Sequence, residues 1–180
     1  MKIMIESDNL ILRDVEFGDY EQFLEWECDP EMTRYFSYDK GRTYEDVVTE
    51  AFAFKYDDSV IDLTITDKST GCALGRVIIS RIDRHHRSLD ITKIYVGGDN
   101  RDRGIGGETL RALIKYSFEE LNMERVTLDY YTANVRAAEL YRRLGFRDEG
   151  RARHACIKDG EFFDLNIMSI LREEYYAKTT

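Results

Sequence analysis

A glycine-rich break between a strand pattern and a helix pattern occupies the middle of the chain. Residues 89–96 predict an apolar strand, and Gly97-Gly98 ends it. From Gly104 to Met123 the pattern is helical, with an apolar stripe made of Leu110, Leu113, Ile114, Phe118 and Leu121. This stretch therefore predicts a strand, a tight loop and an amphipathic helix that must pack against a sheet.

The same two periodicities recur on both sides of this unit. Strand patterns cover residues 10–13, 61–66, 73–81, 126–130, 150–157 and 162–171, and helix patterns cover 20–27, 43–52 and 134–144. The order is one strand, two helices, three strands, a helix, a strand, a helix and two strands. This order predicts an α+β or mixed α/β fold, with helices packed on one sheet.

Local signals fix several boundaries. Thr43 and Asp46 form a capping-box pattern at the start of the second helix, and Asp19 is a candidate cap of the first. The first helix should end before Asp29-Pro30, because the residue before proline avoids the helical region. Asp159-Gly160 predicts a hairpin between the last two strands. The apolar face predicted for the second helix consists of Val47, Val48, Ala51 and Phe52.

The net charge is negative and unevenly distributed. The chain has 180 residues and a formal net charge of −9. Residues 1–60 hold 16 acidic and 6 basic residues, whereas residues 61–180 hold 19 and 20. Binding to nucleic acid needs a basic surface, so this composition argues against a nucleic-acid partner.

The apolar runs and the cysteines bear on location. No apolar run approaches the ~18 residues of a membrane span, and the N-terminus turns acidic too early for a signal peptide. We therefore expect no membrane partner. The three cysteines, Cys28, Cys72 and Cys156, are too few and too widely spaced for a disulfide framework, which favours a cytoplasmic protein. Adjacent His85 and His86 cannot easily face one ion, so we expect no metal site.

The loop from Arg101 to Gly107 is a candidate anion site. Glycines allow close approach of the backbone to a ligand, and the start of a helix offers unpaired N–H groups and partial positive charge. Arg101 and Arg103 add fixed positive charge. The loop lacks the Gly-Lys-Ser/Thr of a Walker A motif and the spacing of a Rossmann fingerprint. A loop that needs glycine only to turn sharply remains the alternative.

Two motifs resemble the GNAT superfamily of acyl-CoA-dependent N-acetyltransferases. Arg101-x-x-Gly104-x-Gly106 matches its (Gln/Arg)-x-x-Gly-x-(Gly/Ala) loop, and residues 134–146 match its Asn-x-x-Ala-x-x-x-Tyr-x-x-x-Gly-Phe signature. The two ends of the chain resemble the RimJ/RimL-type branch, which includes ribosomal-protein and spermidine acetyltransferases. The resemblance implies one domain over residues 1–180, built on a mostly antiparallel twisted sheet of about seven strands flanked by about four helices.

The resemblance also implies acetyl-CoA as donor, a primary amine as acceptor, and direct attack of the amine on the thioester. The strand ending Ile94-Tyr95-Val96 would splay from its neighbour and pair with the pantetheine arm, and the N–H of Ile94 would stabilise the oxyanion. Tyr141 would protonate the leaving thiolate, although its ring also suits a core position. The residues implied in donor binding are Ile94, Tyr95, Val96, Arg101, Asp102, Arg103, Gly104, Ile105, Gly106, Gly107, Asn134, Ala137 and Tyr141.

Asp90 is the candidate general base. It precedes Ile94 by four residues, so strand alternation places both side chains on one face and Lys93 on the other. Many relatives use a carboxylate near this position. A solvated acid at the strand edge, with an ordered water as base, is the alternative.

The acceptor side is expected near the first two helices. Trp26, Asp29, Glu31 and Tyr35 are the candidate substrate-binding residues. The acidic residues of these helices form a predicted rim that would attract a polyamine, a protein N-terminus or a small-molecule amine, or else a face that only keeps the protein soluble. The acids are Glu21, Glu25, Glu27, Asp29, Glu31, Glu45, Asp46 and Glu50.

A non-catalytic acyl-CoA-binding regulatory module is the alternative function. Such a module would be expected to lose Tyr141 or Asn134, and both are present. The final two strands are candidates for a homodimer interface, and the sequence leaves the oligomeric state and the acceptor amine open.

Overall fold

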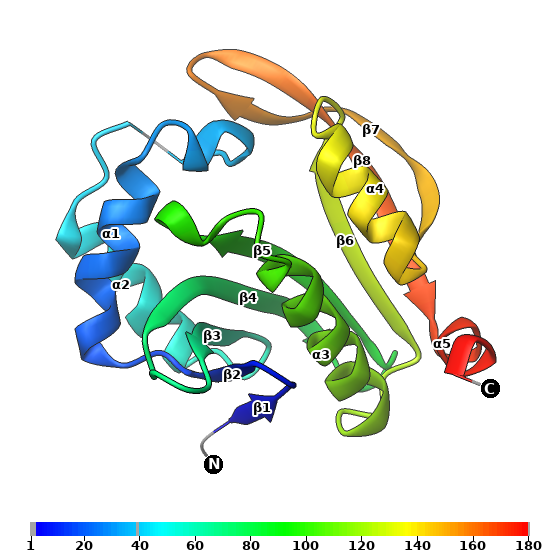
Figure 1. Cartoon of the computed structure of the whole chain (residues 1–180). Helices are drawn as coiled ribbons and strands as arrows, with labels where there is room; N and C mark the ends of the chain where they lie inside the picture. Colours follow the sequence, from blue (N-terminus) through cyan, green and yellow to red (C-terminus); the bar gives the residue numbers. More distant parts are fainter. Residues whose placement is uncertain (1–2, 39, 180) are drawn as a thin grey trace.

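The computed structural model describes residues 3–38 and 40–179, and within them one sheet of eight strands forms the centre of the fold (Figure 1). The strand order is β1-β2-β3-β4-β5-β6-β8-β7, and every neighbouring pair is antiparallel except β5 and β6. The strands are β1 Met4–Glu6, β2 Leu10–Asp14, β3 Ile61–Asp67, β4 Ala73–Asp83, β5 Ser88–Val96, β6 Arg125–Tyr131, β7 Arg147–Lys158 and β8 Glu161–Leu171.

Helices cover both faces of this sheet. The α-helices are α1 Tyr20–Cys28, α2 Tyr44–Lys55, α3 Ile105–Glu119, α4 Val135–Leu144 and α5 Arg172–Thr179. Three short 3-10 turns lie at η1 Phe17–Asp19, η2 Met32–Tyr35 and η3 Gly98–Asn100. Helices α1 and α2 lie on one face and α3 and α4 on the other (Figure 1). We call these the α1/α2 face and the α3/α4 face. Among the described residues, no helix is long and apolar enough to cross a membrane.

Each face has its own apolar core. Under α3 and α4, fully buried side chains such as Leu113 and Phe118 pack against the sheet. Under α1 and α2, Phe23 and Val47 are fully buried beside Tyr95 of β5. Burying one such side chain contributes roughly 1.5–3 kcal/mol. The sheet is therefore fixed from both sides, and its central strands present buried residues to both faces.

Most predicted boundaries agree with the structure. The fold class is confirmed, with one more strand and one more helix than the approximate numbers expected. The strand that the sequence did not predict, β1, has three residues, too few to show alternation. The added helix, α5, follows β8 directly. Helix α1 ends at Cys28, and Thr43 and Asp46 form the predicted capping box of α2.

Two local expectations were wrong. Asp19 precedes α1, but its side chain makes no cap hydrogen bond to that helix. Instead it accepts hydrogen bonds from the Arg13 guanidinium and from the Thr64 hydroxyl, at 2.7 Å each. Phe52, predicted on the apolar face of α2, is 51% exposed. The face that α2 buries is narrower, with Val47 and Ala51 at its centre.

Strands β5 and β6 diverge, and this divergence positions the candidate site. They pair in parallel only where Ser88–Asp90 meets Arg125–Thr127. Beyond that point β5 pairs only with β4, and β6 pairs only with β8. The two strands separate in Figure 1 as they run away from this contact. We call the opening the fork, and Asp90 lies at its apex.

Candidate active site

The fork leaves one edge of β5 without a strand partner. Residues 91–96 of β5 pair with β4 on one side, while β6 has moved away on the other. In an antiparallel pair, alternate N–H and C=O groups point away from the partner. The backbone around Ile94 therefore offers hydrogen-bonding groups to a ligand in the fork, which agrees with the predicted splay of this strand.

A bulge in β5 changes which side chains share a face. The register with β4 shifts between Ile91 and Lys93, so Thr92 is an extra residue in the strand. A bulge of this kind reverses the alternation beyond it. Ile94 packs against the core under α3 and α4. Asp90 instead bonds Thr127 on the opposite, α1/α2 face, which it shares with Lys93. The expected common face of Asp90 and Ile94, and the expected separation of Asp90 from Lys93, are therefore wrong.

The predicted anion loop ends at the start of α3. Gly104 stands at the N-cap with φ of 80°, a left-handed conformation that favours glycine. No side chain caps this end of the helix. The first turn of the 15-residue helix therefore keeps backbone N–H groups for a ligand, with the positive end of the helix dipole behind them. Ile105, Gly106 and Gly107 supply these groups.

The charged residues of the loop contact neighbouring elements. Arg101 lies 3.5 Å from a carboxylate oxygen of Asp29 and 3.9 Å from one of Glu31. Arg103 donates to the side chain of Asn100 at 3.0 Å, and Asp102 pairs with Arg136 of α4. Two acids predicted to bind the acceptor thus lie beside the donor loop, and their substrate-binding role stays a prediction.

Helix α4 places Asn134 and Tyr141 beside the fork. The side chain of Asn134 caps α4 by accepting a hydrogen bond from the Ala137 N–H at 3.2 Å. Two turns later, the Tyr141 ring packs against Tyr130 of β6, with ring centroids 5.6 Å apart. Gly145 ends the helix in the left-handed conformation, as its position predicts.

The hydroxyl of Tyr141 is protonated at neutral pH. Tyr141 is 9% exposed, and burial raises the pKa of its phenol to about 12, with the negative charge of Asp129 adding to the effect. Within residues 3–38 and 40–179 the phenol has no hydrogen-bond partner. A buried, protonated phenol with a free hydroxyl can donate its proton to a ligand.

Asp90 is buried and already engaged. One oxygen lies 2.9 Å from the Arg81 guanidinium and accepts from Thr92 at 3.1 Å, and the other accepts from Thr127 at 2.7 Å. Both carboxylate oxygens of Asp90 therefore already have donors within the protein. This arrangement suits a residue that holds the apex of the fork together.

On the α1/α2 face, Trp26 and Tyr35 have different surroundings. Trp26 is 6% exposed, and its ring lies so close to Gly97 that a Cβ there would stand 2.0 Å from it. Trp26 is therefore a core residue, and β5 needs a glycine at its end to pass it. Tyr35 lies beside Tyr131 of β6, whose hydroxyl is 2.7 Å from that of Ser37. The aromatic surface near the fork is thus formed by Tyr35 and Tyr131.

The tip of the β7–β8 hairpin closes over this surface. The ammonium of Lys158 donates to the carbonyl oxygens of Thr33 and Arg34, at 2.6 and 3.1 Å. Phe163 of β8 packs against Tyr131, with ring centroids 5.2 Å apart. In Figure 1 the hairpin extends from the far edge of the sheet toward the segment that follows α1. The hairpin and η2 therefore border the same side of the fork.

A buried ionic cluster lies behind this surface, and the sequence did not predict it. Arg76 of β4 is fully buried and contacts three carboxylates. It forms two hydrogen bonds with Asp62, at 2.7 and 2.9 Å, and lies 3.0 Å from both Glu27 and Glu50. Arg42 contacts Glu27 and Glu50 as well, and Lys93 lies 3.5 Å from Glu50. Three acids thus meet three cations.

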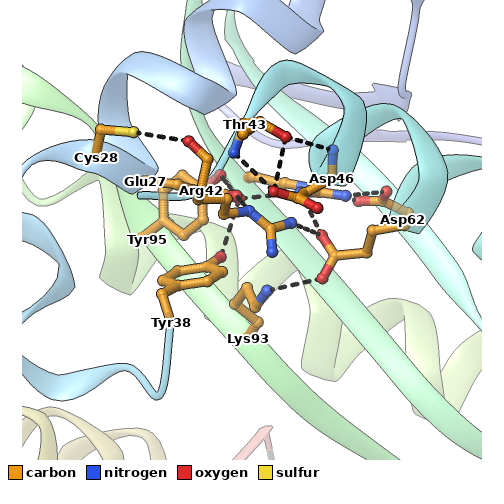
Figure 2. Close-up of polar contacts among 11 residues, drawn as sticks. Glu27, Cys28, Tyr38, Arg42, Thr43, Asp46, Asp62, Lys93 and Tyr95 are labelled. Carbon is orange, nitrogen blue, oxygen red and sulfur yellow. Dashed lines mark hydrogen bonds and ion pairs between the residues drawn. The ribbon is translucent and has the colours of Figure 1, made fainter. Parts of the chain in front are cut away.

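Glu27 is the centre of this cluster. Its carboxylate accepts hydrogen bonds from Tyr38 and Tyr95, at 2.9 and 2.8 Å, as Figure 2 shows. Burial opposes ionisation of Glu27, but Arg76, Lys93 and the other donors outweigh it and hold its pKa below the usual range. Burial lowers the pKa of Lys93, while its acidic neighbours oppose that shift. The cluster ties α1 and α2 to the middle of the sheet.

The comparisons with known proteins agree with this geometry. The model of the acetyltransferase (GNAT) domain matches residues 9–147, most of the chain. The chain belongs to the GNAT acetyltransferase family. It is 25% identical over 172 residues to an uncharacterized N-acetyltransferase, YoaA, of Bacillus subtilis, covering 94% of this chain and 97% of that one. It is 26% identical over 104 residues to the spermidine N(1)-acetyltransferase of Escherichia coli, covering 58% and 55%.

A solved GNAT structure has the same fold. A spermidine N-acetyltransferase from Vibrio cholerae, solved with CoA and spermine, superposes with a TM-score of 0.86 at 22% identity, covering 94% of this chain and 99% of that one. The family uses acetyl-CoA as its acetyl donor, so this GNAT chain is an acetyl-CoA-dependent N-acetyltransferase. The comparisons give no support to the non-catalytic module.

A substitution at Gly106 tests whether the start of α3 binds acetyl-CoA in this GNAT protein. A Cβ at this position would meet nothing within 4 Å beyond its chain neighbours and its own helix. The Gly106→Ala variant is therefore expected to keep its free energy of unfolding or to gain up to about 1 kcal/mol. Its Kd for CoA, measured by calorimetry, should weaken at least ~10-fold, since the added methyl group crowds the backbone that must approach the ligand.

Gly18→Ala is the matched control. Gly18 lies in η1, away from the fork, and a Cβ there also meets nothing within 4 Å. This variant should bind CoA as the unmodified protein does. Equal CoA affinity in the two variants would contradict the placement of the donor at this helix.

Proposed function

We propose that this chain transfers an acetyl group from acetyl-CoA to a cationic primary amine that enters from the α1/α2 face of the fork. The observation that carries the proposal is the fork itself, which has the uncapped start of α3 and Tyr141 on one face and the aromatic surface of Tyr35 and Tyr131 on the other. The proposal gives each substrate its own side of the sheet. The two substrates then meet at the unpaired edge of β5.

On the donor side, the backbone N–H groups at the start of α3 hold the diphosphate, helped by Arg101 and Arg103. The unpaired edge at Ile94, Tyr95 and Val96 pairs with the pantetheine arm. The side-chain amide of Asn134, whose oxygen already caps α4, keeps its N–H groups for the same arm. These residues fit the donor because they present a strand edge and a helix start, and the donor needs both.

The reaction needs an oxyanion donor and a proton for the leaving sulfur. The N–H of Ile94 bonds the thioester oxygen as it becomes negative, and one such donor contributes a factor of about 10²–10³ in rate. Tyr141 gives its phenolic proton to the sulfur as the carbon–sulfur bond breaks. Proximity of amine and thioester in the fork supplies a further part of the acceleration.

The acceptor is a cation, and exposed acids raise its rate of encounter. Glu21, Glu25, Glu31 and Glu45 remain exposed on the α1/α2 side. Glu27 and Glu50 are neutralised in the buried cluster, and Asp46 accepts hydrogen bonds from Thr43 in the capping box of α2. Half of the predicted rim is thus available for steering. The likeness to a spermidine acetyltransferase supports a polyamine or a similar small amine as acceptor.

Location and assembly complete the proposal. Cys28, Cys72 and Cys156 are all free thiols, which supports a reducing, cytoplasmic compartment. One N-acetyltransferase domain spans residues 1–180. A homodimer through the final hairpin stays a prediction.

An amine panel tests this function. Thiol release from acetyl-CoA is measured with spermidine, an alanine-terminated peptide and an amino sugar as acceptors. The proposal expects amine-dependent release, fastest with the most cationic acceptor and slowed by salt, because screening weakens steering. Tight CoA binding with no turnover on any amine would contradict the proposal.

A further inference from the structure

We infer that Asp129 of β6, rather than Asp90, accepts the proton that the acceptor ammonium must lose before it attacks. The inference rests on the proposed function and adds the missing base to it. Asp129 lies inside the fork on the acceptor side, and its carboxylate, unlike that of Asp90, is engaged by no donor in the described part of the chain.

Asp129 lies inside the fork, one step beyond its apex. Asp90 pairs with Thr127 in the last rung that joins β5 and β6, and their side chains are hydrogen-bonded at 2.7 Å. Asp129 follows Thr127 by two residues, and the register of β6 with β8 is unbroken here. The side chains of Thr127 and Asp129 therefore lie on the same face of the sheet. It lies about 7 Å further along β6, where β5 has moved away.

The two aspartates differ in their partners. Arg81, Thr92 and Thr127 engage both oxygens of Asp90. Asp129 is exposed, and within residues 3–38 and 40–179 its carboxylate has neither an ion pair nor a hydrogen bond. Its neighbour across the sheet on β8 is the apolar Ile167. Asp129 can therefore receive a proton without first breaking a contact.

The charged and titratable groups around Asp129 make it a better base than a free aspartate. Although the side chain of Asp129 reaches solvent, neighbouring protein atoms remove part of its hydration and raise its pKa, and the negative charge of Asp90 on β5 raises it further. The guanidinium of Arg81 on β4 acts in the opposite direction. On α4, Tyr141 faces the other side of β6 and is protonated. A carboxylate with a raised pKa holds a proton more readily near neutral pH.

Asp129 and Tyr141 then stand on opposite faces of β6. Tyr130, which lies between Asp129 and Tyr131 in β6, packs against the Tyr141 ring on the donor side. Asp129 faces the α1/α2 side, with Tyr131, from which the amine enters. The base is thus on the acceptor side of the fork and the acid on the donor side.

The proton balance closes with these two groups. Asp129 takes one proton from the ammonium, and the amine nitrogen uses the freed electron pair to bond the thioester carbon. When the carbon–sulfur bond breaks, Tyr141 protonates the sulfur and recovers a proton from the new amide nitrogen. Asp129 releases its proton to solvent, so each turnover yields one amide, one free thiol and one proton.

The test compares Asp129→Asn with Asp90→Asn in the full chain. The measurement is kcat/KM against pH, between about pH 6 and 10, with whichever of spermidine and an alanine-terminated peptide the unmodified protein acetylates faster. Asp129→Asn should lose ~10²-fold at pH 7. The loss should shrink as pH rises, since more of the amine is then already neutral. Asp90→Asn should keep the rise of kcat/KM with pH, shifted slightly to lower pH because a negative charge that raises the pKa of Asp129 has been removed.

Two variants and a melting curve separate folding from chemistry. Asp129→Glu keeps a carboxylate and should recover most of the activity, and Glu120→Gln removes one exposed acid at the far end of α3 as a control of charge. An unchanged pH profile in Asp129→Asn, or its loss in Asp90→Asn, would overturn the inference. Absence of turnover in the unmodified protein would instead count against the proposed function.

Discussion

The Tyr141→Phe variant is expected to lose at least ~100-fold in kcat and to fold normally. The loss follows from removal of the proton donor for the leaving sulfur, since a positioned acid contributes roughly 10²–10⁴. Stability should change by less than about 1 kcal/mol, because the phenol has no hydrogen-bond partner among the described residues and the ring is kept. Steady-state kinetics and thermal unfolding measure the two effects separately.

The pH dependence of the unmodified protein checks the same assignment. An acid donates only below its pKa, and burial raises the pKa of Tyr141 to about 12. Titration of Tyr141 should therefore cause no fall in kcat below about pH 10. Tyr116→Phe, a half-buried tyrosine of α3, is the matched control and should keep its kcat. Unchanged kcat in Tyr141→Phe would contradict the role of this phenol as the acid.

The Arg76→Met variant is expected to cause a large loss of stability, about 3–5 kcal/mol. Removing one partner of a buried ion pair leaves the others buried without compensation. Here Glu27, Glu50 and Asp62 would all lose their common cation. For a protein of this size the loss corresponds to a fall in Tm of about 6–20 °C. Arg143→Met, which removes an exposed arginine of α4, should change Tm little.

The pH dependence of this loss has a defined sign. Burial already raises the pKa of Asp62, and loss of Arg76 raises it further. Loss of Arg76 also removes the main group that holds the pKa of Glu27 low. Carboxylates with a raised pKa destabilise the fold at neutral pH, and protonation relieves the cost as pH falls through the raised value. The stability difference between Arg76→Met and the unmodified protein should therefore shrink from pH 7.5 to pH 5. A constant difference would mean that lost packing, rather than uncompensated charge, causes the destabilisation.

Local patterns in the sequence predicted most of the fold. The capping box at Thr43, the stop before Pro30 and the hairpin at Asp159-Gly160 each depend on contacts within four residues, which a single sequence displays. The donor loop and its helix are local in the same sense. The family resemblance predicted that they lie beside two strands that diverge. The short pairing of β5 with β6 agrees with that prediction.

The acceptor side depends on distant contacts, and there the sequence was a poorer guide. Thr92 looks like an ordinary strand residue, and only its register with β4 makes it a bulge that turns Asp90 away from Ile94. Glu27 and Glu50 look like surface acids of two helices until Arg76, 49 and 26 residues away, is brought between them. In the sequence, Asp129 looks like an ordinary polar residue of an alternating strand. Nothing in the neighbouring residues shows that it lies in the fork.

Coupling of thiol release to acetylation tests the central claim most directly. The purified protein is incubated with acetyl-CoA and the best acceptor of the panel, and free thiol and acetylated amine are quantified in the same sample, the amine by mass spectrometry. We expect one acetylated amine for each thiol released, with release that requires both the amine and Tyr141. Thiol release that does not depend on the amine, or that leaves the amine unmodified, would contradict the assignment of the fork as the site where a cationic amine is acetylated.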